Sequence, residues 1–279
     1  MEVKNKQFDE ERALYASKNI LVTNCTFSGP ADGESALKES ENVRVDNSFF
    51  NLRYPFWHNN NLSINSSHMS ENCRAPLWYS KDIKIVDSIL DGTKAIRECQ
   101  KVELINTSVK SQEFFWKTSD FHIFDTKIES EYPFLETKDG FIERLELKAK
   151  YSFQYAKNIL IVDSFLDTKD AFWHTENITV KNSTIKGEYL GWYSNNLTLD
   201  HCKIIGTQPL CYCKNLTLID CEMIDCDLAF EYSEVKATVN SAILSVKNPI
   251  KGYIKAKEIK EIILDENQKE GSDCKISIV

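Results

Sequence analysis

The chain has 279 residues, a formal net charge of −8 and 42% hydrophobic residues. The acidic balance argues against a nucleic-acid partner, and no apolar stretch approaches the roughly 20 residues of a membrane span, so we expect neither partner. The charged start MEVKNKQFDEER lacks an apolar signal region, so we expect a cytoplasmic protein whose nine cysteines are reduced thiols.

One motif organises the chain, and NITVKNSTI, which begins at Asn177, is its clearest copy. Similar nonapeptides include NVRVDNSFF, NILIVDSFL and NLTLDHCKI. From Asn19 to Glu234 the opening polar residue recurs at intervals of 23, 19 and 21 residues and then eight times at 19 residues. A fixed period over this length predicts a repeat architecture.

Each repeat is predicted to hold three short strands separated by bends. With the opening residue as position zero, positions one and three are apolar, as in Ile178 and Val180, and position eight is apolar too. Such alternation is typical of a strand with one buried face. Position five is usually Asn or Asp, which suit bends because they tolerate left-handed backbone, and position six is small. A third segment has a large apolar residue five places before the next zero, such as Phe56 or Phe172.

In chain order, one β-helix domain is predicted over 1–279. Residues 1–10 are predicted to form an N-terminal lead or cap, 11–239 regular coils, 240–265 C-terminal strands or a cap, and 266–279 a mobile tail. The period predicts an all-β, single-stranded, right-handed parallel β-helix of about 12 coils of ~19 residues. A leucine-rich repeat needs a helix in each unit and a left-handed hexapeptide helix needs a period of six, and neither pattern is present.

All five tryptophans lie in the third segment, four places before the next zero. If position minus five points inward, positions minus four, six and eight point outward, and one outer face carries indoles, charges and small residues. An outward row of indoles needs a reason, and sugar rings stacked on it would be one. The predicted substrate-binding residues are Arg53, Trp57, His58, Arg74, Trp78, Lys94, Trp116, Lys150, Trp173, Glu188 and Trp192.

The charged neighbours of these indoles are the candidates for catalysis. A basic group can abstract a proton in a β-elimination, and a pair of acids can hydrolyse a glycoside. The predicted catalytic residues are Arg97, Glu113, Glu131, Lys169, Asp170 and His174. Glu131 and Glu188 lie three coils apart, ~14 Å by the stacking distance, so Glu113 with Glu131 is the closer hydrolase pair.

Several of these predicted functional residues also have a structural interpretation. Lys169 and Glu188, one coil apart, fit an exposed ion-pair ladder, and the tryptophans fit rings covered by a loop, the tail or another subunit. Cys202 and Cys221 both fall at inward position six, which predicts stacked core thiols rather than a metal site. We therefore expect no metal and no cofactor.

Several strings carry a resemblance to a known family, among them GPADGESALKES, LRYPFWHN, CRAPLWYS, TKDAFWHT, GEYLGWYS and GTQPLCY. They resemble a bacterial domain-of-unknown-function family of pectin-lyase-like β-helix proteins, over nearly the whole chain. The resemblance to the wider superfamily implies polysaccharide lyase, glycoside hydrolase or carbohydrate esterase chemistry. No calcium-binding Asp cluster of pectate lyases and no paired-Asp signature of polygalacturonases is found in this sequence.

Two functions from different classes remain. The first is a carbohydrate-active β-helix that binds an oligo- or polysaccharide along the tryptophan face, with or without lyase or hydrolase activity. The second is a non-enzymatic scaffold that uses the aromatic face as a protein interface or for homo-oligomer formation.

Overall fold

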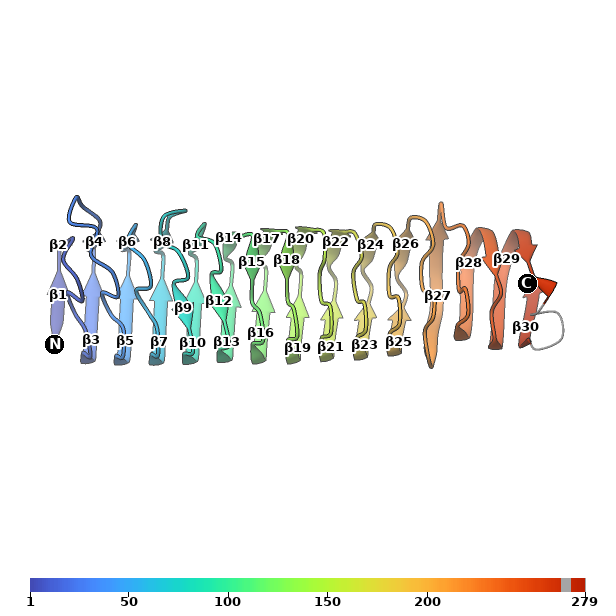
Figure 1. Cartoon of the computed structure of the whole chain (residues 1–279), viewed down its shortest axis with the longest axis horizontal. Coiled ribbons are helices and arrows are strands. Elements are labelled where there is room, and N and C mark those ends of the chain that lie inside the picture. The colour runs from blue at the N-terminus through green and yellow to red at the C-terminus, as the bar shows by residue number, and fades with distance from the viewer. Residues whose placement is uncertain (267–271, 279) are drawn as a thin grey trace. The chain divides into compact units, whose positions relative to one another are not determined.

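The computed structural model (Figure 1) describes residues 1–266 and 272–278. The chain divides into two compact units, Met1–Phe141 and Ile142–Val279. The fold is the predicted right-handed parallel β-helix, with about 14 turns rather than about 12. No helix among the described residues is long and apolar enough to cross a membrane.

The first unit is built from parallel strands that recur once per turn. Residue Ile83 lies beside Val102 on the next turn, which is the 19-residue step of the sequence. Residues predicted to be a lead or cap also form paired strands, because Glu2 lies beside Leu21 and Phe8 beside Phe27. The strands of this unit are β1 (Glu2–Lys4), β2 (Gln7–Phe8), β3 (Lys18–Thr23), β4 (Thr26–Phe27), β5 (Glu41–Asp46), β6 (Phe49–Phe50), β7 (Asn60–Asn65), β8 (His68–Met69), β9 (Leu77–Trp78), β10 (Lys81–Val86), β11 (Ile89–Leu90), β12 (Ile96–Arg97), β13 (Gln100–Ile105), β14 (Ser108–Lys110), β15 (Glu113–Phe114), β16 (Ser119–Phe124), β17 (Lys127–Ser130) and β18 (Tyr132–Pro133), and β19 (Lys138–Glu143) runs over the boundary.

The second unit continues the same pattern within its own residues. Its last strands are long, and β27 pairs with β25 through Leu218 and with β26 through Met223. Asp273–Ile278, part of the predicted mobile tail 266–279, form β30 and pair in parallel with β29, so the prediction is wrong for these residues. Residues 267–271 and 279 of that predicted tail lie outside the described residues. The strands are β20 (Glu146–Ala149), β21 (Lys157–Val162), β22 (Phe165–Thr168), β23 (Glu176–Lys181), β24 (Thr184–Lys186), β25 (Asn195–Asp200), β26 (Lys203–Ile205), β27 (Leu216–Ile224), β28 (Glu234–Lys247), β29 (Lys251–Ile263) and β30 (Asp273–Ile278).

The bends at positions zero and five have left-handed backbone, as the prediction for position five requires. Asn19 has a φ of 54° and Asn24 a φ of 52°. Asn also links successive turns, because the Asn42 amide donates to Asn19 at 2.9 Å and the Asn61 amide donates to Asn42 at 2.8 Å. These side-chain ladders give the repeated Asn a structural role, since they join turns at the points where the strands begin.

The interior consists of columns of equivalent side chains. Phe27 is fully buried and stacks on Phe50 with ring centroids 4.5 Å apart. Position six is buried too, and its hydroxyls serve the backbone of the preceding turn: Ser48 Oγ accepts from the Cys25 amide and Ser67 Oγ from the Ser48 amide. A small polar residue at this corner therefore pairs a buried amide that no strand neighbour reaches.

The third segment differs from the prediction at position minus six. Its residues, such as Pro55, Ala95 and Phe114, are buried rather than outward-facing. The reason is a left-handed residue beside them, Tyr54 with a φ of 58° or Phe115 with a φ of 65°, which breaks the alternation of an extended strand. The segment is therefore a corner with two adjacent inward side chains, and only short paired strands, such as β9 with β12, form in it.

Candidate functional site

The predicted indoles of the first unit form one continuous column, which we call the indole column: Lys38, Trp57, Trp78, Arg97 and Trp116. Trp57 and Trp78 stack with centroids 4.9 Å apart and planes 6° apart. The Arg97 guanidinium lies between two indoles, 5.1 Å from Trp78 and 5.3 Å from Trp116, and the Lys38 amine lies 5.6 Å from Trp57. The structure thus brings the tryptophans together, as predicted, and adds cations to the same stack.

In the indole column, the ring faces and N–H groups that a sugar could contact already contact other parts of the protein. Each indole is half-buried, and its N–H donates to a backbone carbonyl of the next turn, as Trp78 does to Lys94 at 2.9 Å and Trp116 does to Tyr132. The faces of Trp78 are covered by Trp57 and Arg97. Since a sugar ring stacks on an aromatic face, the column presents ring edges instead of a stacking platform.

The charges beside the indole column are mostly paired within the protein. Lys94 lies 3.7 Å from Glu113, and Arg97 lies 3.3 Å from Glu98. Glu131 accepts a hydrogen bond from Gln112 at 3.3 Å. Glu113 and Glu131, the predicted hydrolase pair, are therefore each held by a different neighbour.

Three further predicted residues of the first unit lie in the same region. Arg53 contacts Asp32 at 3.2 Å and Glu34 at 3.6 Å. His58 and Arg74 are exposed. His58 stacks on Tyr79, the ring at the same position of the next turn, at 5.1 Å.

The second unit carries its own aromatic columns. Trp173 stacks on Trp192 at 5.4 Å, and their N–H groups donate to the carbonyls of Tyr189 and Gln208. His174 lies between Tyr155 and Tyr193, with centroid distances of 5.0 and 4.9 Å. The column goes on with Tyr212 and Tyr232.

Two of the charged residues predicted as catalytic in the second unit, Lys169 and Asp170, are paired or buried within the protein. Lys169 lies 3.0 Å from Glu188, as the ion-pair interpretation predicts, and the hydrogen bond to Glu188 raises the pKa of Lys169. Asp170 is only 7% exposed, and burial raises the pKa of its carboxyl. Lys150 is exposed.

A hollow that the sequence analysis missed lies on the outer side of the first unit, across β7, β10, β13 and β16. Its volume is about 450 Å³. Two ion pairs join lining residues of successive turns, with Lys84 3.1 Å from Glu103 and Lys101 3.4 Å from Asp82. It is lined by Asn61, Leu62, Ser63, Asp82, Ile83, Lys84, Lys101, Val102, Glu103, Asp120 and His122.

His122, which lines this hollow, connects it to two neighbouring aromatic rings. His122 meets Phe124 and Phe141 edge-on, at 6.0 and 6.1 Å. Val86 and Ile105 hold the same position of their turns as Phe124, and all three are half-buried. The sequence held a signal for this face, because position four is apolar in these three turns and polar in many others.

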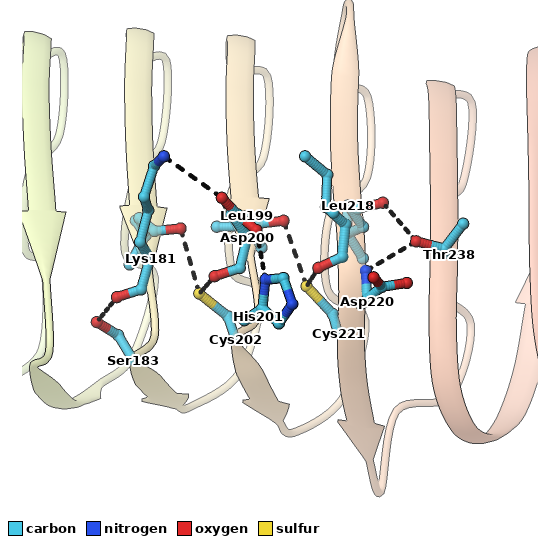
Figure 2. A network of polar contacts seen from close by, with 12 residues as sticks. Lys181, Ser183, Leu199, Asp200, His201, Cys202, Leu218, Asp220, Cys221 and Thr238 are labelled. Atoms are coloured by element: carbon cyan, nitrogen blue, oxygen red, sulfur yellow. Dashed lines mark hydrogen bonds and ion pairs between the residues drawn. The ribbon is translucent and has the colours of Figure 1, made fainter.

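Eight of the nine cysteines are buried, and Cys274 is partly exposed. Figure 2 shows Cys202 and Cys221 on successive turns, where their thiols donate to backbone carbonyls, the Cys221 thiol to Leu199 at 3.3 Å. Burial raises the pKa of the Cys221 thiol to about 12. Among the described residues, no three His, Cys, Asp or Glu side chains form a group that could hold a metal ion. The prediction of stacked core thiols is confirmed in its placement.

A protein-family comparison decides the relationship of the chain. The family described as "Protein of unknown function (DUF3737)" matches residues 1–277. The chain belongs to this family. A search of the curated proteins finds no match to this DUF3737 chain.

Solved structures similar to the DUF3737 chain were also found. A surface adhesin of Streptococcus pneumoniae, PfbA, is 11% identical, with 81% of this chain and 71% of that chain covered and a TM-score of 0.40. The periplasmic alginate epimerase AlgG is 8% identical, with 93% and 76% covered and a TM-score of 0.40. Tailspike protein 3 of bacteriophage CBA120 is 8% identical, with 99% and 51% covered and a TM-score of 0.24. At these scores the likenesses support no argument about function.

Proposed function

We propose that the first unit of this protein binds a saccharide, and that the hollow across β7, β10, β13 and β16 is the binding site. The observation that carries the proposal is a space of about 450 Å³ lined largely by hydrogen-bonding side chains. Ligand sites in proteins commonly have volumes of about 300–1,000 Å³. The hollow is therefore large enough for a short oligosaccharide.

The chemistry of the lining suits a polyhydroxylated ligand. Carboxylates such as Glu103 accept hydrogen bonds, ammonium groups such as Lys84 donate them, and Asn61 does both. Because Lys84 and Glu103 already neutralise one another, a hydroxyl can bridge them without burying an unpaired charge. The imidazole of His122 also lines the hollow and offers a ring to the C–H groups of a sugar.

The position of the site differs from the tryptophan face considered in the sequence analysis. The indole column has its ring faces covered and its N–H groups bonded to the backbone, which leaves it little to offer a sugar. We therefore assign it the role of holding successive turns together.

Ligand-observed NMR with short neutral oligosaccharides tests the proposal. Glu103→Ala removes a lining carboxylate and should lower the affinity by about 1–2 kcal/mol, roughly five- to thirtyfold. Glu176→Ala in the second unit is the matched control, because Glu176 pairs with Lys157 at 2.8 Å and its side chain is 42% exposed, against 37% for Glu103. Equal effects of the two variants, or no binding by the unaltered protein, would refute the proposal.

A second candidate function, self-association, rests on the tyrosines of the second unit. Tyr155 and Tyr193 are 50% and 47% exposed and belong to one stacked column. Exposed aromatic rings are enriched in protein interfaces. Sedimentation over a range of concentrations tests this: association that Tyr193→Ser weakens would support an interface, and a monomer at all concentrations would exclude it.

A further inference from the structure

The charges of the hollow are unevenly satisfied. Both of its lysines are held by carboxylates, Lys84 by Glu103 at 3.1 Å and Lys101 by Asp82 at 3.4 Å. Asp120 also lines the hollow and is exposed, yet among the described residues its carboxylate makes no ion pair. The one charge left over in the hollow is thus negative.

The position of Asp120 makes this charge available to a ligand. Strands β13 and β16 run in register, so Lys101 is the neighbour of Asp120 on the preceding turn. The Lys101 amine nevertheless pairs with Asp82 on the other side. Asp120 therefore lies at the end of the ion-pair chain, next to the end of the hollow where His122 meets Phe124 and Phe141.

We infer that the saccharide bound in the hollow is an amino sugar, whose protonated amine pairs with Asp120 while its ring lies towards the aromatic end. This inference rests on the proposed saccharide function and specifies its ligand. An acidic sugar is disfavoured, because neither lysine is free to pair with it and the protein carries a net charge of −8. A neutral sugar binds without the added attraction.

Three oligosaccharides with one backbone test the inference: a tetramer of β-1,4-linked glucosamine, its N-acetylated form and cellotetraose. They differ at carbon 2, where the first has an amine, the second an uncharged amide and the third a hydroxyl. Since the pair would be exposed, the glucosamine tetramer should bind about three- to fivefold more tightly than the other two at low salt. The preference should shrink at high salt, because salt screens exposed charges.

Two variants separate a specific pair from general attraction to an acidic protein. Asp120→Asn should abolish the preference for the amine, so that the glucosamine tetramer binds no more tightly than cellotetraose. Asp82→Asn keeps Asp120 but releases Lys101, which can then turn to Asp120, so the preference should fall here too. Glu176→Gln in the second unit removes the same charge and should keep the preference.

The outcomes distinguish the two proposals. Binding of cellotetraose as tightly as the glucosamine tetramer, or a preference that survives Asp120→Asn, would overturn the amino-sugar inference and leave the saccharide proposal standing. If none of the three oligosaccharides binds, the saccharide proposal itself fails.

Discussion

The structural role of the indole column can be tested at Trp78. In Trp78→Ala, three interactions disappear: the stack on Trp57 at 4.9 Å, the contact with the Arg97 guanidinium at 5.1 Å and the N–H bond to Lys94 at 2.9 Å. An aromatic stack contributes about 0.5–1.5 kcal/mol, a half-exposed cation–π contact about 0.5–1 kcal/mol and a hydrogen bond about 0.5–1.5 kcal/mol. We expect the free energy of unfolding to fall by about 1.5–4 kcal/mol.

Urea unfolding followed by circular dichroism measures this change. Trp78→Phe is the matched control, because it keeps an aromatic ring in the column but loses the N–H bond and part of the ring area, so it should cost less than Trp78→Ala, about 1–2 kcal/mol. A loss below about 0.5 kcal/mol in Trp78→Ala would show that the column does not hold the turns together. If the variant instead kept its stability but lost saccharide binding, the tryptophan face would be the binding site and the reasoning above would be wrong.

Three further predictions concern the core. Phe27 is fully buried between Phe8 and Phe50, so Phe27→Ala should cost about 3–5 kcal/mol in the same unfolding assay. Burial raises the pKa of Asp170 in the folded protein, so the folded state loses stability as pH rises from the unfolded-state pKa of this carboxyl to its folded-state pKa. Asp170→Asn should therefore raise the melting temperature at pH 7 but not near pH 3. Eight cysteines are buried and Cys274 is partly exposed, so mass spectrometry should find a thiol reagent on Cys274 first.

The face used for the saccharide proposal shows why the site was hard to find from the sequence. The alternation of β10, β13 and β16 predicts that Lys84, Glu103 and His122 point outward on one column. It does not predict which lysine pairs with which carboxylate, because Lys101 has a carboxylate on each side, Asp82 on the preceding turn and Asp120 on the following turn. In the structure Lys101 pairs with Asp82. The rotamer of Lys101 therefore leaves Asp120 without an ion pair among the described residues, and only the three-dimensional structure shows this rotamer.

The same limit applies to the tryptophans. Their spacing predicts that they share a column, which the structure confirms for Trp57 and Trp78. Whether ring faces point to solvent or to each other depends on the side-chain torsions. It also depends on the hydrogen bond, 2.9 Å long, that the Trp78 indole N–H donates to the Lys94 carbonyl of the next turn. No periodic pattern contains that information, so the face that looked most suited to sugars turned out to be self-stacked.

By itself the sequence determined the architecture, because the 19-residue period places like residues at equal heights and the alternation of Ile83 and Ile85 assigns their faces. Left-handed corners such as Tyr54 and Phe115 reversed the expected direction of their neighbours, and the pairing of β30 with β29 was likewise decided in three dimensions. The physical reason is that a period fixes where each backbone segment lies, whereas backbone handedness at a corner and the choice of side-chain partner depend on contacts between turns.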